Sequence, residues 1–173
     1  MPFQIVHNDI TKMNTEAIVN AANTQLLQGG GVCGAIFEAA GEKLLQKECN
    51  EIGSCKEGQA VITKGYNLKS KYIIHAVGPI WRGGDYNEEE FLKSAYRNSL
   101  EIARNKKIKS IAFPLISSGS YGYPKEKALD IAVETIKDFL TNNDIDIYLV
   151  VYDKKSVMIS KKIYNTIDHY INT

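Results

Sequence analysis

Short apolar runs of strand length alternate along this 173-residue chain with segments whose apolar residues recur at three- and four-residue intervals. The strand-like runs are continuous and rich in β-branched residues, which is typical of strands buried on both faces. Strands that alternate with helices predict a largely parallel sheet covered on both sides. We therefore expect an α/β protein, a three-layer α/β/α sandwich. The six expected strands span residues 3–6, 17–19, 60–63, 72–77, 110–115 and 145–152.

Two of the segments between these runs have a clear helical period. Apolar and small residues recur at helical spacing over residues 91–103 and 128–140. Another helix is expected to begin near Val32, directly after a glycine triplet. A final helix is expected to begin at a cap formed by Asp153 and to continue through Ile167.

The composition is that of one ordinary globular domain, which we expect to span residues 1–173. Hydrophobic residues make up 44% of the chain and charged residues 24%, enough for a sizeable core. A formal net charge of +1 supplies no strong field for attracting nucleic acid, and the basic run over residues 106–109 is interpreted as a solvated helix end. No signal-peptide pattern or membrane-length apolar run occurs, so we expect a soluble, cytoplasmic protein without a membrane partner.

The cysteines argue against a disulfide framework and against a structural zinc site. Their odd number leaves at least one thiol unpaired, and no Cys-x-x-Cys pair occurs among Cys33, Cys49 and Cys55. The histidines show no metal-ligand spacing relative to these thiols: His7, His75 and His169. We therefore expect free thiols, buried or partly buried, and neither a metal nor another cofactor.

Residues 18–37 contain the best candidate for an anion site. An apolar strand end delivers Asn20 and Asn23, and the triplet at residues 29–31 leads into a helix start. Glycines let the backbone turn its N–H groups toward an anion, and the helix start adds unsatisfied N–H groups and a positive dipole end. The spacing fits neither a Walker loop nor the fingerprint Gly-x-Gly-x-x-Gly. The junction therefore predicts a phosphate cradle of another kind.

A second loop of similar character follows the apolar run that ends at Ile116. It reads Ser-Ser-Gly-Ser-Tyr-Gly over residues 117–122, where the glycines permit close backbone approach and the hydroxyls add donors. Loops at the carboxyl ends of strands in an open sheet converge, so both loops should line one site. Two facing anion loops suit a diphosphate better than a single phosphate.

These two loops, together with residues 8–11, resemble the corresponding parts of a macrodomain of the MacroD type. The similarity continues through residues 58–63, 75–79 and 112–114 and so covers nearly the whole chain. The resemblance implies a three-layer fold around a mixed sheet, and it implies ADP-ribose or O-acetyl-ADP-ribose as ligand. It further implies an enzyme that removes mono-ADP-ribose from modified proteins, deacetylates O-acetyl-ADP-ribose, or does both.

The resemblance also implies roles for individual residues. Asp9, with the backbone of Ile10 beside it, is implied to bind the adenine amino group, and Tyr152 to stack on adenine. Asn23 is implied to contact the distal ribose, over which Tyr121 packs. The other ligand-binding residues implied are Gly30, Gly31, Val32, Ser117, Ser118, Gly119 and Ser120.

Some of these residues also have structural explanations. Asp9 follows a strand in a polar turn, which is typical of an Asx turn or a helix cap. Tyr152 ends the last apolar run and would equally suit the core. One of the two asparagines at the first loop is expected to fasten the loop backbone, and we expect a structural role for Asn20.

The sequence departs from the MacroD pattern at two positions. Cys33 stands where such hydrolases usually carry an aspartate, and Phe37 replaces a histidine common in that group. The first change removes a carboxylate that would activate or orient water at the distal ribose. Three outcomes stay open: water positioned by Asn23 while a substrate phosphate takes its proton, catalysis by Cys33 itself, or binding without cleavage.

We expect hydrolysis at a rate below that of aspartate-bearing relatives, with Asn23 and Cys33 as the catalytic residues. A non-catalytic ADP-ribose reader is the alternative, and a phosphatase acting on ADP-ribose phosphate would differ only in the bond attacked. A nucleic-acid binder would need a basic face with exposed aromatics such as Trp81 and Tyr86. The balanced charge argues against high affinity for nucleic acid.

Overall fold

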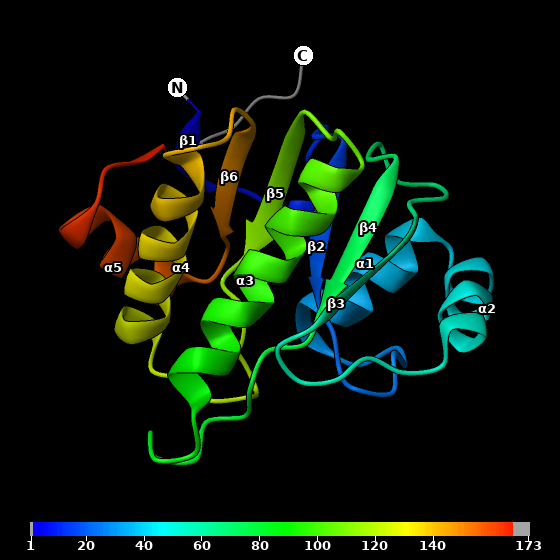
Figure 1. Cartoon of the computed structure of the whole chain (residues 1–173), viewed down its shortest axis with the longest axis horizontal. Coiled ribbons are helices and arrows are strands. Elements are labelled where there is room, and N and C mark those ends of the chain that lie inside the picture. The colour runs from blue at the N-terminus through cyan, green and yellow to red at the C-terminus, as the bar shows by residue number, and fades with distance from the viewer. Residues whose placement is uncertain (1, 168–173) are drawn as a thin grey trace.

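A seven-stranded mixed sheet lies between layers of helices in the computed structural model, which describes residues 2–167 (Figure 1). The strands are β1 Phe3–His7, β2 Ala17–Ala21, β3 Ala60–Lys64, β4 Tyr72–Ala76, β5 Ser110–Pro114, β6 Asp146–Val151 and β7 Thr166–Ile167. Their order is β3-β4-β2-β5-β6-β1-β7, and every pair is parallel except β3 with β4. The predicted mixed, largely parallel sheet is therefore confirmed.

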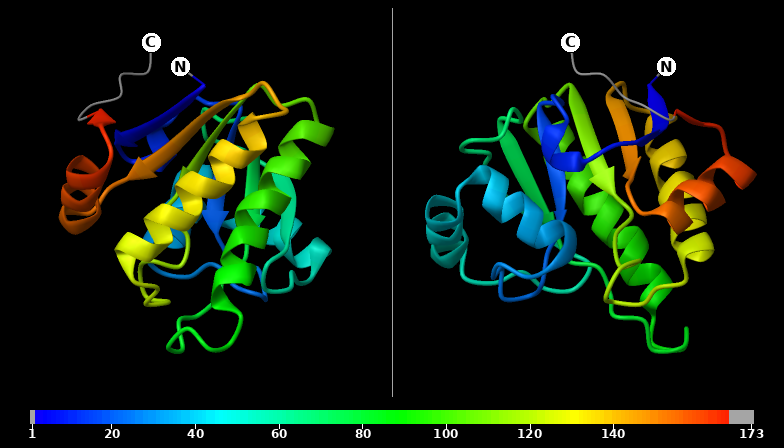
Figure 2. Two further views of the ribbon diagram at one scale, coloured as in Figure 1. Left: turned by 60° about the vertical axis from the view of Figure 1, so that its left-hand side comes forward. Right: turned by 180° about the vertical axis from the view of Figure 1, so that it is seen from behind.

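Helices cover both faces of this sheet (Figure 2). They are η1 Ile10–Lys12, α1 Gly31–Ala40, α2 Glu42–Ile52, α3 Glu88–Asn105, α4 Lys125–Leu140 and α5 Lys154–Ile163. Helices η1, α1 and α2 share one buried cluster with the sheet, and α3 and α4 share a second cluster with its other face. Helix α5 packs against α4 and β7. The predicted three-layer sandwich is confirmed.

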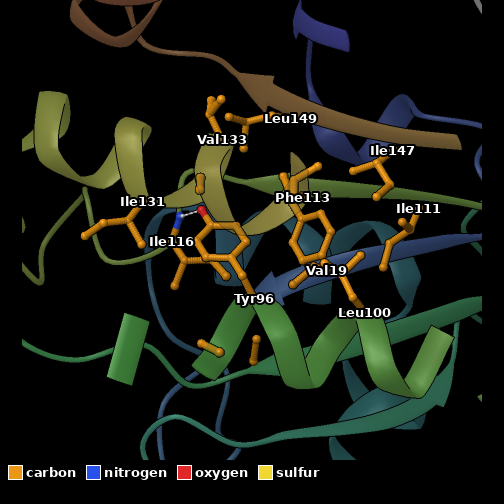
Figure 3. Packing of buried hydrophobic residues seen from close by; sticks show 14 of the residues in the cluster. Val19, Tyr96, Leu100, Ile111, Phe113, Ile116, Ile131, Val133, Ile147 and Leu149 are labelled. Atoms are coloured by element: carbon orange, nitrogen blue, oxygen red, sulfur yellow. Dashed lines mark hydrogen bonds between the residues drawn. The ribbon is translucent and has the colours of Figure 1, made fainter. Parts of the chain in front are cut away.

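The central strands are buried on both faces, as their continuous apolar runs predict. In β5, Ile111 and Phe113 belong to the cluster under α3 and α4, whereas Ala112 belongs to the cluster under α1 and α2. Figure 3 shows Phe113 close to Tyr96, and Ile111 near Leu100, both of α3. Alternate side chains of one strand thus hold the two helical layers on the sheet.

The expected final helix is shorter than the sequence predicts. Helix α5 ends at Ile163, and Ile167 lies in β7, so the prediction of a helix through Ile167 was wrong. Thr166 pairs with Ile5 of β1 in parallel register, and β7 thereby covers an edge that β1 would otherwise expose. The helical spacing of the two isoleucines carries no information about this strand partner, which is distant in the sequence.

The three cysteines are free and buried: Cys33, Cys49 and Cys55. Burial raises the pKa of Cys49 to about 11 and also raises the pKa of Cys55, so these two thiols stay protonated at neutral pH. Within residues 2–167 no three metal-ligating side chains gather, and His169 lies outside the described residues. No helix in the described part of the chain is long and apolar enough to cross a membrane.

The carboxyl ends of β1, β2, β5 and β6 meet at one edge of the sheet (Figure 1). The segments that follow these strands are η1 and residues 22–30, 115–124 and 152–153. Ligands of open α/β sheets bind at this edge. The fold therefore brings together the segments in which the sequence places its candidate site.

Candidate functional site

A cleft of about 590 Å³ opens at this edge of the sheet, between the loops that follow the four strands. Its volume is in the range of sites for ligands of nucleotide size. Asn20 lies behind the cleft, outside its lining. The sequence-predicted residues that line the cleft are Asp9, Ile10, Asn23, Gly30, Gly31, Val32, Cys33, Ser117, Ser118, Gly119, Ser120, Tyr121 and Tyr152.

The glycine triplet forms the entry to α1. Gly30 is the N-cap with extended backbone and makes no side-chain cap bond, whereas Gly31 has φ +56°, a conformation that favours glycine. A Cβ atom added at Gly30 or Gly31 would meet nothing within 4 Å, so the backbone here borders open space. The first N–H groups of α1 have no partner within the helix and lie at the cleft. This geometry suits an anion.

Glycine is also required at Gly34, a position that no sequence motif marks. A Cβ atom on Gly34 would lie 2.6 Å from the carbonyl oxygen of Gly29. The absence of a side chain at Gly34 therefore lets the glycine loop close against the first turn of α1.

The segment before the triplet is fastened by two amide side chains. Asn23 donates from Nδ2 to Leu27 O at 2.8 Å and accepts from Leu27 N at Oδ1 at 3.0 Å. Gln46 of α2 accepts from Gln28 N at 2.9 Å and donates to Leu26 O at 3.0 Å. The asparagine that fastens the loop backbone is therefore Asn23, which also lines the cleft. A carboxamide keeps a second N–H and a second lone pair for a ligand.

Asn20 belongs to a buried polar chain behind the cleft. It is 1% exposed, and its Nδ2 lies 3.0 Å from His75 Nδ1 and 3.7 Å from Cys33 Sγ. His75 Nε2 lies 2.9 Å from Thr63 Oγ1. Burial lowers the pKa of His75 to about 4, so the ring is neutral at pH 7. Asn20 thus holds Cys33 from behind, in keeping with its expected structural role, and separates the thiol from the imidazole.

The second loop has a strained start. Ser117 has φ +68°, and its Oγ is buried without a partner in the described part of the chain. A Cβ atom on Gly78 would lie 2.2 Å from this Oγ, so the loop needs glycine there. Tyr123 N donates to Ser117 O at 2.9 Å and closes the loop. Strain of this kind is typical of ligand-binding segments.

Tyr96 of α3 fixes the strand end from which this loop departs. Its buried hydroxyl donates to Pro114 O at 3.0 Å and accepts from Ile116 N at 2.9 Å, the second bond being drawn in Figure 3. Burial raises the pKa of Tyr96 above its ordinary value, so the hydroxyl keeps its proton. In the sequence Tyr96 is only one apolar position of a helix, so no pattern indicates its part in shaping the site.

The loop over residues 81–87 supports the second loop from outside. Trp81 N donates to Tyr121 O at 2.8 Å. The carboxylate of Glu88 accepts from three backbone N–H groups of the 81–87 loop, those of residues 82, 84 and 86. Burial would raise the pKa of Glu88, but these bonds outweigh it and lower the pKa to about 2. Trp81 is half-buried and held in place, while Tyr86 is exposed.

Asp9 and Tyr152 follow the adjacent strands β1 and β6, where Asn8 N donates to Val151 O at 3.2 Å, and both line the cleft on the side away from β2. Asp9 Oδ1 accepts from Thr11 N at 3.0 Å and from Thr11 Oγ1 at 2.7 Å, so Asp9 caps η1. Both bonds use Oδ1, which leaves the lone pairs of Oδ2 for a ligand. Tyr152 is 72% exposed, so the core alternative for this ring was wrong.

Lys125 joins the two rims of the cleft and was missed by the sequence analysis. Its Nζ donates to Ser118 O at 2.9 Å and lies 3.6 Å from Asp153 Oδ2. Asp153 caps α5 through Ser156, as predicted. Burial would raise the pKa of Asp153, but the bonds from Ser156 and the charge of Lys125 hold it below its usual value.

Comparison with known proteins identifies the family. Residues 19–132 match the family model "Macro domain". A macro domain-containing protein of Methanosarcina mazei is 55% identical over 92% of this chain and 86% of its own length. A Citrobacter koseri protein named O-acetyl-ADP-ribose deacetylase is 46% identical over 92% of this chain and 93% of its own length.

The fold agrees with this match. A variant of the Oceanobacillus iheyensis macrodomain, solved with ADP-ribose, superposes with a TM-score of 0.85 at 44% identity over 91% of this chain and 89% of its own. Sequence and structure together show that the chain belongs to the macro domain family.

Proposed function

We propose that this protein binds ADP-ribose in the cleft and hydrolyses O-acetyl-ADP-ribose, the linkage of mono-ADP-ribose to protein, or both. The observation that carries the proposal is the pairing of two backbone-lined loops, 29–33 and 117–122, across one cleft. A diphosphate between them would accept from the N–H groups at the start of α1 and from the second loop. The relatives named as deacetylases and the neighbour solved with ADP-ribose support this ligand.

The two ends of the cleft differ in chemistry, which orients the ligand. Asp9 and Tyr152 at one end offer an acceptor and an exposed aromatic ring, which suit the adenine amino group and the adenine face. Asn23 and Cys33 lie beside the glycine loop and would face the distal ribose. The reacting bond therefore lies next to α1.

The proposed hydrolysis uses a base supplied by the substrate. Within the described part of the chain, the carboxylates that line the cleft are those of Asp9 and Asp153, which follow β1 and β6, whereas Asn23 follows β2 on the other side of β5. Water positioned by Asn23 would attack the ester carbonyl or the anomeric carbon. A diphosphate oxygen would take the proton of the water, and the leaving group would depart with a proton. We expect slow turnover because no protein carboxylate assists.

A non-catalytic reader of ADP-ribose is the second candidate, favoured by the same shortage of carboxylate at the ribose end. The deciding experiment incubates the protein with O-acetyl-ADP-ribose and with mono-ADP-ribosylated protein and follows product by mass spectrometry. Calorimetry with ADP-ribose is run on the same preparation. Binding with product above the spontaneous rate supports the hydrolase, binding without product supports the reader, and absence of binding overturns both.

A further inference from the structure

Five exposed lysines gather at the end of the molecule opposite the cleft. They come from the end of β3, from the loop between β3 and β4, and from the carboxyl end of α3, and the loop and this helix end lie side by side at the far edge of the sheet in Figure 1. None of the five forms a salt bridge with a described residue. We call them the lysine patch: Lys64, Lys69, Lys71, Lys106 and Lys107.

Tyr72 brings the two halves of the lysine patch together. Lys71 Nζ and Lys106 Nζ lie 5.3 Å and 4.9 Å from the centroid of its ring. Lys64 is the register partner of Tyr72 across the β3–β4 pair. The ring attracts both ammonium groups and offsets part of their repulsion. Two segments more than 30 residues apart thus present their charges on one surface.

The carboxyl end of α3 holds a lysine where glycine would fit better. Ile108 N donates to Ala103 O at 2.9 Å and Lys107 N donates to Arg104 O at 3.0 Å, the bonds of a Schellman motif. Lys107 has φ +59°, the left-handed conformation that this motif usually gives to glycine. The conformation costs stability for a residue with a Cβ atom. The carboxyl end of helix α3 therefore carries a lysine that forms no salt bridge with a described residue. This lysine adopts a left-handed backbone conformation that is unfavourable for a residue with a Cβ atom.

The helix dipole explains only part of this patch. It favours cations at Lys106 and Lys107, but it does not act on the three lysines of the β3–β4 segment. Two carboxylates lie beside the patch and keep their charge. Glu16 accepts from the backbone N–H of Lys109, and Glu48 accepts from the backbone N–H of Lys64 and from the Tyr66 hydroxyl. Five lysines against these two carboxylates leave this surface with a net positive charge. Arg104 is paired with Glu101 and adds no net charge.

We propose that the lysine patch binds the phosphodiester backbone of a nucleic acid, independently of sequence. Unpaired exposed ammonium groups on one surface are the electrostatic footprint of such binding. The Tyr72 ring is already occupied by two lysines, so base stacking adds little and the backbone is the ligand. No large exposed apolar side chain lies within residues 64–72 or 104–109 to anchor a membrane. The formal net charge of the whole chain is only +1, so it does not reveal the positive charge concentrated on this surface.

The test measures fluorescence anisotropy of a labelled single-stranded RNA of about 20 nucleotides and mixed sequence, with the full chain, between about 50 and 200 mM salt. The titration is done with and without saturating ADP-ribose. The variant K71Q/K106Q is compared with K43Q/K47Q on α2, which removes the same charge from exposed lysines of another surface.

We expect K71Q/K106Q to weaken RNA binding by at least about tenfold and to reduce the salt slope by about 1.4, since each phosphate contact contributes about 0.7. K43Q/K47Q and ADP-ribose should change the affinity by less than about twofold. Equal affinities of the two double variants, absence of RNA binding at the lowest salt, or tighter binding to vesicles of anionic lipid would overturn the proposal.

The variant Lys107→Gly tests whether a loss of RNA binding can occur without a loss of stability. Glycine relieves the left-handed conformation, so the unfolding midpoint should rise by about 2 to 4 °C while RNA binding weakens about fivefold. A variant that is more stable and still binds RNA like the wild type would remove Lys107 from the patch.

Discussion

Cys33 lies at the amino end of α1, with Sγ 3.7 Å from Asn20 Nδ2 and 3.8 Å from Leu27 O. The thiol is buried and lines the cleft. A nucleophilic cysteine needs a neighbouring base that takes its proton, but the side chain in contact with this thiol is a carboxamide, which is not a base. His75 is the nearest imidazole along this chain of contacts, and Asn20 stands between it and the thiol. The local geometry therefore favours a packed cysteine over a nucleophile, and water attack over a covalent step.

Replacing the thiol by a carboxylate should raise turnover. In Cys33→Asp the new side chain would orient or activate water beside the distal ribose, and we expect product release to rise by about 10²-fold, the lower end of the range for general base catalysis. Single-turnover kinetics with O-acetyl-ADP-ribose measure the change. Cys33→Ser is the matched control, because it introduces a polar group that cannot act as a base. Its rate of product release should stay close to that of the wild type. An unchanged rate in Cys33→Asp would show that the missing carboxylate does not limit turnover.

Asp9 should contribute to affinity through its charge. Asp9→Asn keeps an oxygen that can cap η1 through Thr11, whereas Asp9→Ala loses both the cap and the proposed acceptor for adenine. We expect Asp9→Ala to weaken ADP-ribose binding by about 1 to 3 kcal/mol. Asp9→Asn should weaken binding with little change in the unfolding midpoint. Wild-type affinity in both variants, measured by calorimetry, would remove Asp9 from the site.

At the scale of elements, the cleft depends on contacts that tie its loops to helices and strands. Tyr96 of α3 fixes the end of β5, Gln46 of α2 holds the first loop, and Lys125 of α4 joins the second loop to Asp153. Each of these side chains acts on backbone that is distant in sequence or belongs to another element. The loops are thus positioned before a ligand arrives, which lowers the cost of ordering them.

Tyr96→Phe should loosen the second loop at its origin. The substitution leaves Pro114 O and Ile116 N without their buried partner, which costs about 1 to 3 kcal/mol of unfolding free energy. Urea unfolding measures this loss, and calorimetry with ADP-ribose should show weaker binding as well. Leu100→Ala, in the same helix and cluster, is a control that loses stability without touching the loop. If both variants keep wild-type affinity, Tyr96 serves the core alone.

His75 links β4 to β3 and β2 and should make stability depend on pH. Its pKa is lowered by burial from 6.5 to about 4, so the unfolded chain binds a proton more readily than the folded one. This contribution is fully present above pH 6.5 and is lost as pH falls toward 4. NMR should show a His75 ring that does not titrate between pH 7 and 5, while urea stability declines. Titration of this ring near pH 6.5 would contradict the buried neutral state.

At the scale of the whole molecule, the sheet separates two surfaces of different chemistry. The carboxyl ends of the central strands and the loop between β3 and β4 lie at opposite ends of the sheet (Figure 1). The first end carries the cleft and the second carries the lysine patch. The proposed ligands of both surfaces contain phosphate. Because the two surfaces lie at opposite ends, each should bind its ligand without displacing the other.

The sequence predicts the layers and the segments of the cleft, but not the contacts that hold them. Continuous apolar runs and two glycine-containing loops identify the sheet and the edge where the loops meet. The resemblance assigns Asn23 to the ligand and a structural role to Asn20, but the sequence does not show which carboxamide fastens the loop, because that depends on how each side chain is buried. Lys125 and Tyr96 were missed because their partners come from other segments, and β7 was missed because two paired residues leave no pattern.

The central claim is that both loops hold one diphosphate, and an acidic group placed in the second loop tests it most directly. A Cβ atom at Gly119 would meet nothing within 4 Å, so Gly119→Asp adds a negative charge at the cleft without disturbing the packing. Calorimetric titration of the wild type with ADP-ribose and with adenosine should show clearly tighter binding of ADP-ribose. In Gly119→Asp that preference should fall by at least about tenfold with an unchanged unfolding midpoint. Equal binding of ADP-ribose by the two proteins, or no binding by the wild type, would contradict the account.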